Sequence, residues 1–233
     1  MGTSQSHKLL KKPSWSKAKK AMTDVVKNPT SANIQRWATA FANAVSSDAS
    51  GSNGHFGSAG AQIMGNFIDF LISSQQNPNS FLGKNLEEYK NLSRGELIDL
   101  LFNTISGHRD SNPDEMAAQI AILQVLDEIT ENSESISDIQ KTFINAANND
   151  FPSILIDFHA HYIMEYSGEL FQDHIFSKGG DVDVIYNDIL EYVKVDIATE
   201  LSHGTEKINF MSPQGKAYVE SLTTKILSIW AQR

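Results

Sequence analysis

The densest group of side chains that could do chemistry is DFHAHYIMEYSGELFQDH, in the second half of the chain. On a helix, His161, Glu165 and Glu169 follow one another at steps of four residues and share one face, as metal ligands could. His159 would point about 200° away from His161, because each residue turns the helix by about 100°. The stretch is also rich in Ile, Met, Tyr and Phe, so a plain amphipathic helix explains it equally well. We expect His159, His161 and His174 to be structural or surface residues, and we predict no metal site.

Motifs of other catalytic classes are missing from the sequence. The chain has no cysteine, which excludes a disulfide scaffold, a thiolate metal site and a cysteine nucleophile. It also has no G-x-S-x-G motif that would present a serine nucleophile. The glycine-rich SGSNGHFGSAG has no closing Lys-Ser/Thr and no strand before it, so we interpret it as a flexible connector and not as a phosphate loop. We predict that the protein is not an enzyme, has no catalytic residues and needs no cofactor.

The opening residues, MGTSQSHKLLKK, combine a small second residue with a basic run. MGTSQS fits the pattern of amino-terminal myristoylation, and the lysines would add an electrostatic membrane signal, but the pattern is short and the modification is eukaryotic. The other interpretations are a nucleic-acid arm, a flexible start, and a substrate for another enzyme. All of them share one property: a small second residue allows the initiator methionine to be removed, which leaves Gly2 as the free amino terminus.

A free α-amine is a better nucleophile at neutral pH than a lysine side chain. Its reference pKa is about 7.7–8.0, compared with about 10.4 for lysine, so a useful fraction of it is unprotonated. Gly2 has no side chain, and the residues after it are small. The start of the chain could therefore enter a narrow active site and attack an activated carboxyl group.

Charge is unevenly distributed along the 233 residues, whose net charge is −9. Up to Ser47 there are eight Lys/Arg and one acid, and the rest of the chain has eleven Lys/Arg and twenty-seven acids. An acidic body would repel phosphate, so we expect no direct nucleic-acid binding. No segment has the roughly 18 apolar residues of a membrane span, and no apolar region follows the basic start as in a secretory signal. We therefore expect a cytoplasmic protein that binds no membrane.

Apolar periodicity predicts an all-α fold, an irregular bundle of about seven to nine helices behind a disordered N-terminal tail. Helix starts are marked by the capping box SRGE at Ser93–Glu96, by NPDE at Asn112–Glu115 and by MSPQ near Ser212. Trp15, Trp37 and Trp230 fall within helical patterns, so we expect them to be core or interface anchors and not a stacking platform for bases. The apolar residues expected to face the core are Ile34, Trp37, Phe41 and Val45; Ile63, Phe67, Phe70 and Leu71; Leu97, Leu100, Leu101 and Ile105; Met116, Ile120, Leu123 and Leu126; Ile185, Ile189, Val193 and Ile197; and Val219, Leu222, Ile226 and Ile229.

Composition divides the chain into four segments. These are a flexible tail (1–13), a basic helical segment (14–47), a Gly/Ser linker (48–60) and an acidic helical body (61–233). Residues 1–12 are polar and have no buried periodicity, so we expect them to be disordered in the isolated protein.

The chain resembles the QatB family, the small helical component of the four-gene Qat anti-phage defence clusters of bacteria. The resemblance rests on MGTSQS, on the tryptophans in PSW and QRWATAF, and on HFGSAGAQIMGNFIDFL. It continues through LSRGELIDLLFNTI, NPDEMAAQIAILQVLDEI and the region from FHAHYIMEYSGELFQDHI to VIYNDILEYVKVDIA, so it spans nearly the full length. The chain departs from the family where HKLLKK replaces a tail that is usually richer in Gly and Pro.

The resemblance implies partners: a QueC-like enzyme of the QatC type, and the ATPase and TatD-like nuclease of the same system. QueC enzymes adenylate a 7-carboxy-7-deazaguanine and let ammonia displace AMP. A relative that admits a protein amine would form an amide instead, so the resemblance implies that Gly2 is joined to a deazaguanine. On this view Gly2 is the modification acceptor, and Thr3, Ser4, Gln5 and Ser6 form the peptide that the partner recognises.

Two other hypotheses stay open at this point. The chain could be a helical adaptor that binds a partner ATPase or nuclease without any modification. It could also be a metal-dependent enzyme centred on His161.

Overall fold

The computed structural model describes residues 12–48, 56–107, 112–204 and 208–233. Nine α-helices lie in these ranges, which confirms the all-α class. They are α2 (Ser16–Lys27), α3 (Ser31–Asp48), α4 (Ser58–Gln76), α5 (Arg94–Ser106), α6 (Pro113–Thr130), α7 (Ile136–Asn145), α8 (Phe151–Ser177), α9 (Val182–Gly204) and α10 (Pro213–Gln232). The shorter elements are the 3-10 turns η1 (Pro13–Trp15) and η2 (Leu86–Tyr89), the π-helical turn η3 (Ala146–Asp150), and strands β1 (Ser80–Phe81) and β2 (Lys84–Asn85).

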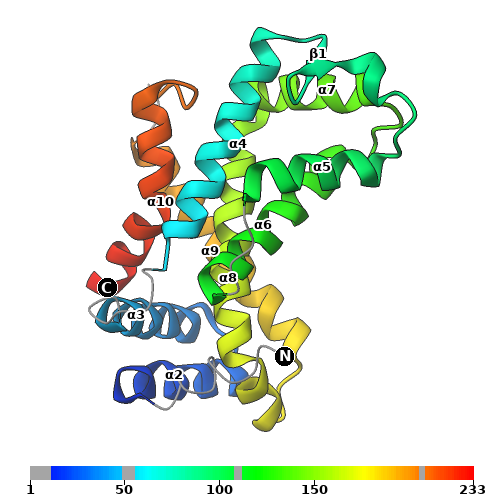
Figure 1. The fold of residues 1–233 in the computed structure, drawn as a ribbon. Coiled ribbons are helices and arrows are strands. Elements are labelled where there is room, and N and C mark those ends of the chain that lie inside the picture. Colours follow the sequence, from blue (N-terminus) through cyan, green and yellow to red (C-terminus); the bar gives the residue numbers. More distant parts are fainter. Residues whose placement is uncertain (1–11, 49–55, 108–111, 205–207) are drawn as a thin grey trace.

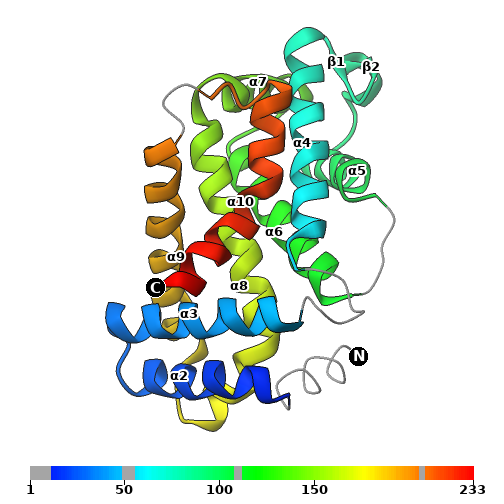
Figure 2. The ribbon, with the colours of Figure 1, turned by 90° about the vertical axis from the view of Figure 1, so that its left-hand side faces the viewer.

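Helices α2 and α3 pack side by side at one end of the molecule (Figure 1). Helices α4, α8 and α10 run away from this pair toward the opposite end, where the two short strands lie (Figure 2). Helix α8 packs against α2, α6 and α9, and α10 packs against both α3 and α4. The last helix of the chain therefore connects the first pair of helices to the rest of the fold.

The predicted helix starts are confirmed by the cap geometry. The Ser93 amide donates to Glu96 Oε2 at 2.8 Å and the Ser93 hydroxyl oxygen accepts from the Glu96 amide at 3.3 Å, which completes the capping box. Asn112 Oδ1 accepts from the Glu115 amide at 2.9 Å, and Ser212 Oγ accepts from the Gly215 amide at 3.1 Å. These side chains satisfy amides that the first helical turn leaves without partners.

An aromatic cluster joins η1 and α3 to α8. Trp15 lies edge-on to Phe41 with ring centroids 5.9 Å apart, and Trp37 stacks on Phe41 at 5.3 Å. Both indoles also contact Phe171 of α8, each at 6.2 Å. Trp15, Trp37 and Trp230 are all at most 1% exposed, so the prediction that the tryptophans are core anchors is confirmed.

The predicted core face of α6 is wrong. Met116, Ile120 and Leu123 are 37%, 40% and 40% exposed, and only Leu126 of the predicted set is buried. The helix instead buries a face rich in small residues: Ala117, Ala118, Ala121, Ile122, Val125 and Leu126. Alanines let the backbones of α6 and its main neighbour α8 approach closely, so the small residues face the core.

Two smaller departures concern the same set of predicted faces. Leu100 of α5 is 39% exposed, and Ile229 of α10 is only half-buried. Next to Ile229, Trp230 is buried and takes its place in the core. The remaining predicted faces are buried as expected.

The short antiparallel ladder was not anticipated from the sequence. Ser80 pairs with Asn85 and Phe81 with Lys84, and the turn between them has positive φ at Leu82 (49°) and Gly83 (78°). Positive φ at both central residues belongs to the tight hairpin turns that match strand twist. With only two residues in each strand, there is no alternating pattern that a sequence window could detect.

Both ends of the predicted 48–60 linker meet helices. Helix α3 extends to Asp48 and α4 begins at Ser58, while residues 49–55 lie outside the described part of the chain. Phe56 is buried, and its ring lies 4.2 Å from that of Tyr166 and 4.8 Å from that of Tyr162. The chain is thus anchored in the core just before α4 starts.

A buried carboxylate holds the start of α4. Asp114, in the first turn of α6 and 7% exposed, accepts hydrogen bonds from the Gly57 amide at 3.1 Å and the Ala59 amide at 3.0 Å. The Ser58 hydroxyl donates to it at 3.2 Å, and the Tyr162 hydroxyl donates to its Oδ1. Burial and the Asp114 charge raise the pKa of Tyr162 well above its ordinary value, which keeps this donor protonated.

Asp114→Ala is expected to lower the free energy of unfolding by about 2–4 kcal/mol, because it leaves buried donors without an acceptor and uncaps α4. Urea denaturation followed by circular dichroism measures this. Asp99→Ala is the matched control: Asp99 is exposed on α5, and its removal should change stability by less than about 0.5 kcal/mol. Equal stability of the two variants would contradict the capping role.

His159 is a buried, neutral histidine between α8 and α10. It is 1% exposed, and its Nδ1 lies 2.8 Å from Oγ1 of Thr223, which is itself 1% exposed. Burial lowers the pKa of His159 to about 3. Because the unfolded chain binds this proton near pH 6.5 and the folded chain does not, His159 reduces stability as the pH falls below 6.5.

We therefore expect a pH dependence that can be removed with His159→Leu combined with Thr223→Val, which takes away both hydrogen-bond partners together. Between pH 7 and pH 5 the chain without substitutions should lose about 2 kcal/mol more unfolding free energy than the double variant. Urea titrations at the two pH values measure the difference. Equal losses would show that His159 is not held neutral.

Candidate partner-docking groove

The residues predicted to carry the function lie outside the described residues. Gly2, Thr3, Ser4, Gln5 and Ser6 all precede Lys12, where the described chain begins. The predicted modification and recognition sites therefore remain predictions. What the structure does describe is the surface from which the tail departs.

The point where the tail meets the fold is tightly fixed. Pro13 is exposed, but Trp15, two residues later, is 0% exposed in the aromatic cluster. Further along the chain in α2, Thr23 Oγ1 and His174 Nε2 lie 2.9 Å apart, and His174 Nε2 is 3.1 Å from the Lys19 carbonyl oxygen. Burial, followed by the Lys19 charge, lowers the pKa of His174, so a neutral ring joins α2 to α8.

A groove of about 700 Å³, lined mainly by polar residues, begins at this point and follows α3. Pro13, Ser14 and Lys17 line it near the tail, residues of α3 from Gln35 to Ser47 line its length, and Arg233 completes it. We call it the cationic groove, because its charged lining residues are Lys17, Arg36 and Arg233, and none of the described lining residues is acidic or aromatic. A positive groove on a chain of net charge −9 is a local exception to the overall charge.

A ladder of polar side chains runs along the α3 side of the cationic groove. Gln35, Thr39, Asn43 and Ser47 recur every fourth residue and so lie on one face. Three of them donate one turn back: Thr39 Oγ1 to the Gln35 carbonyl at 3.0 Å, Asn43 Nδ2 to the Thr39 carbonyl at 2.9 Å, and Ser47 Oγ to the Asn43 carbonyl at 2.8 Å. The hydroxyl hydrogens of Thr39 and Ser47 and one N–H of Asn43 are thus used within the helix.

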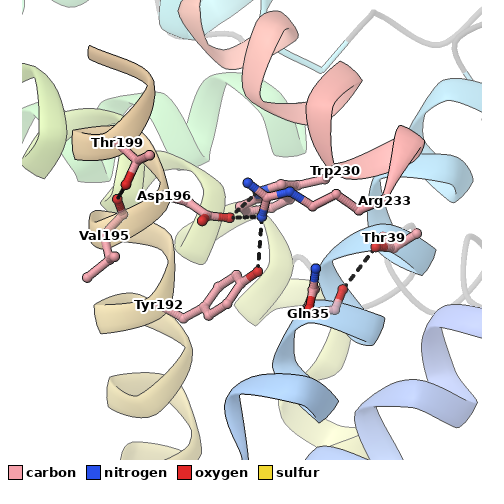
Figure 3. Close-up of polar contacts among 8 residues, drawn as sticks. All are labelled: Gln35, Thr39, Tyr192, Val195, Asp196, Thr199, Trp230 and Arg233. Atoms are coloured by element: carbon pink, nitrogen blue, oxygen red, sulfur yellow. Dashed lines mark hydrogen bonds and ion pairs between the residues drawn. The ribbon is translucent and has the colours of Figure 1, made fainter. Parts of the chain in front are cut away.

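The three cations of the groove differ in their hydrogen-bond and ion-pair partners. Arg36 donates to Asn33 Oδ1 at 2.6 Å, and neither Arg36 nor Lys17 has a carboxylate partner among the residues that the structure describes. Arg233 donates to Asp196 Oδ2 at 2.6 Å and to the Tyr192 hydroxyl at 3.2 Å. In Figure 3 the Arg233 side chain reaches from the end of α10 toward α9, where Trp230 Nε1 also donates to Asp196 Oδ2 at 2.8 Å. Lys17 and Arg36 are therefore the cations best placed to meet an anionic ligand.

The polar face of α8 that resembled a metal site instead connects neighbouring helices. Glu165 Oε1 accepts from Tyr186 of α9 at 3.0 Å and from Gln124 of α6 at 3.3 Å. His161 Nε2 lies 3.8 Å from Glu128 Oε1 of α6, whereas His159 on the other side faces α10. The side chain of Glu169 lies outside the described part, and the described residues contain no group of three or more potential ligands that could hold a metal ion.

Sequence reasoning missed the polar ladder of α3. The segment was interpreted from its apolar face, Ile34, Trp37, Phe41 and Val45, and all four residues are buried. The four-residue spacing of Gln35, Thr39, Asn43 and Ser47 was visible on the opposite face, but such spacing is typical of any solvated helix surface. Arg233 could not have been assigned to this surface, because it lies almost two hundred residues away in the chain.

His161→Leu is expected to leave the melting temperature unchanged or raise it by a few degrees. His161 is 8% exposed, burial lowers its pKa, and neither ring nitrogen has a hydrogen-bond partner in the described part, so an apolar replacement removes a desolvation cost. Thermal unfolding with and without excess zinc measures this. A zinc-dependent rise in the melting temperature that disappears in His161→Leu would restore the metal hypothesis.

No helix in the described ranges is long and apolar enough to cross a membrane.

No family model, curated protein or solved structure matches this chain.

Proposed function

We propose that this protein is a non-catalytic component of a bacterial anti-phage defence system and the protein substrate of a QueC-like enzyme that joins a 7-deazaguanine to Gly2. The observation that supports the proposal is the short distance in sequence between an exposed residue and a fully buried anchor. Pro13 is at the surface and Trp15 is fixed in the core, so the tail leaves the body at one defined point. A tail that starts at a fixed point beside a docking surface would bring Gly2 close to an enzyme bound there.

The tail is long enough for this role. The eleven residues from Gly2 to Lys12 can span at most about 36–40 Å when fully extended. That length would allow the amino terminus to reach an active site set back from the surface of an enzyme that is docked at the cationic groove.

The chemistry balances without a redox partner. The enzyme would activate the carboxyl group of a 7-carboxy-7-deazaguanine with ATP: a carboxylate oxygen attacks the α-phosphorus, pyrophosphate leaves, and an acyl adenylate forms. The unprotonated Gly2 nitrogen then attacks the acyl carbon, an amide bond forms, the amine loses a proton, and AMP leaves with the electron pair of the broken C–O bond. Efficient attack requires the nitrogen to lie within about 3–3.5 Å of the acyl carbon, and the absence of a side chain at Gly2 allows that approach.

The alternative is a helical adaptor that binds the partner ATPase or nuclease of the system without any modification. The cationic groove would serve this function equally, since docking does not require a reactive amine. The mass of the amino-terminal peptide separates the two functions. Modification predicts loss of methionine plus a deazapurine-sized addition, whereas the adaptor predicts loss of methionine alone.

Gly2→Glu is the test of the proposal. A large second residue blocks removal of methionine and crowds the acyl carbon, so the addition should be absent from the intact mass after co-expression with the QueC-like enzyme. Anti-phage activity beside the partner genes should fall to background, and the melting temperature should not change.

Gly95→Glu provides the matched control. Gly95 is exposed near the start of α5, and a side chain there meets nothing within 4 Å, so modification and defence should both be retained. If Gly2→Glu keeps full defence, the modified-terminus function is wrong and the adaptor function stands.

A further inference from the structure

The cationic groove has the dimensions and the chemistry of a binding site for an extended chain. It is about 700 Å³ in volume and follows α3 from Gln35 to Ser47. Side chains four residues apart on a helix are separated by about 6 Å along its axis. An extended peptide presents groups on the same side every two residues, about 6.6 Å apart, which is close to the spacing of the ladder.

The ladder offers acceptors to a ligand. The Thr39 hydroxyl hydrogen and one N–H of the Asn43 amide are directed to carbonyls one turn back, so Thr39 Oγ1 and Asn43 Oδ1 can accept from a ligand, while the second Asn43 N–H can still donate. Acceptors require donors on the ligand. A peptide backbone supplies an N–H at each residue, whereas a nucleic-acid phosphate backbone supplies acceptors.

The charges of the groove specify the side chains of the ligand. Lys17 and Arg36 have no carboxylate partner in the described ranges, and no described lining residue is acidic. Carboxylates on the ligand would pair with these cations, and Arg36 can engage one with two parallel N–H groups. The groove has no aromatic lining residue on which a base could stack, which disfavours single-stranded nucleic acid.

We propose that the cationic groove binds an extended acidic peptide segment of a partner protein. The backbone of the segment donates to the ladder of α3, and its carboxylates pair with Lys17 and Arg36. This binding function goes beyond the modification of Gly2, because an unmodified chain would use the groove in the same way. Since the groove starts at Pro13, a partner held there is also held next to the tail.

The probe is a fluorescein-labelled peptide of about ten residues that alternates Glu with Thr, long enough to span the ladder when extended. Its binding to the full chain is followed by fluorescence anisotropy at low salt and at physiological salt. A peptide in which Lys replaces Glu and a single-stranded oligo(dT) of equal length are the comparison probes. We expect saturable binding of the acidic peptide that is stronger at low salt, and much weaker binding of the other two.

Two pairs of substitutions separate the groove from the overall charge. Lys17→Gln with Arg36→Gln should weaken binding of the acidic peptide about ten-fold or more. Lys84→Gln with Lys90→Gln removes the same number of cations near β2 and η2, at the other end of the molecule, and should leave the affinity within about two-fold.

A third pair tests the polar ladder of α3. Thr39→Val with Asn43→Ala, which keeps every charge, should weaken binding about three-fold or more.

Several results would overturn the proposal. These are equal losses in the two cation pairs, tighter binding of oligo(dT) than of the acidic peptide, and no saturable binding of the acidic peptide at low salt. A second copy of this chain is the other possible occupant of the groove, and sedimentation of the chain without substitutions measures self-association. Self-association that Lys17→Gln with Arg36→Gln abolishes would assign the groove to a second copy of this chain. Circular dichroism of each variant establishes that it is folded.

Discussion

The position of α4 depends on one buried carboxylate. Asp114 projects from the first turn of α6 and accepts from the amides of Gly57 and Ala59 at the first turn of α4. Amides at the start of a helix carry partial positive charge, so they stabilise a carboxylate that has no cationic partner among its described contacts. The geometry is closed by Tyr162 of α8, whose hydroxyl donates to the same carboxylate. Helices α4, α6 and α8, which are distant in sequence, thus meet at the Asp114 carboxylate.

The packing around that charge leaves little freedom. A Cβ at Gly60 would lie 2.3 Å from the Tyr162 ring, so only glycine lets α4 approach α8 this closely. Once α4 is fixed at its start, α5 and α10 can pack along it, and the β1–β2 hairpin is placed at its far end. The same α10 also packs against α3, which carries the cationic groove. Packing contacts therefore run from the groove through α10 to a helix whose start is held by Asp114.

Local chemistry explains which parts of the fold could be predicted from sequence. The caps at Ser93, Asn112 and Ser212 depend on residues three positions apart, and all three were predictable. Asp114 was predictable as an acid in a first helical turn, but its partners on α4 and α8 are 55 and 48 residues away and leave no local pattern. The alanine face of α6 was missed because large apolar residues dominate any periodicity, whereas close helix packing favours small ones. For the candidate site, the tail was predicted from composition and its proposed site residues lie outside the described residues, whereas the groove requires α3 and Arg233 to be brought together by folding.

The amino terminus and the folded body have different roles in the proposed function. The proposed chemistry belongs to the amino terminus, where a small residue and a partly unprotonated amine suffice. The body fixes the place from which the tail starts. Trp15 is buried two residues after the exposed Pro13, and the cationic groove lies beside it. A division of this kind suits a protein that is acted upon, because a substrate has to present an atom and does not have to activate it.

Pro13 and Arg233 line the same groove, and this has a practical consequence for labelling the protein. A purification tag or fluorescent protein joined before Gly2 would remove the proposed reactive amine, and one joined after Arg233 would start at a residue that lines the groove. The turn at Leu82–Gly83 offers a different attachment point. It lies at the end of the molecule away from α2 and α3, and a side chain at Gly83 has nothing within 4 Å (Figure 1). An epitope inserted in this hairpin turn would leave both ends of the chain available, since exposed turns tolerate insertions best.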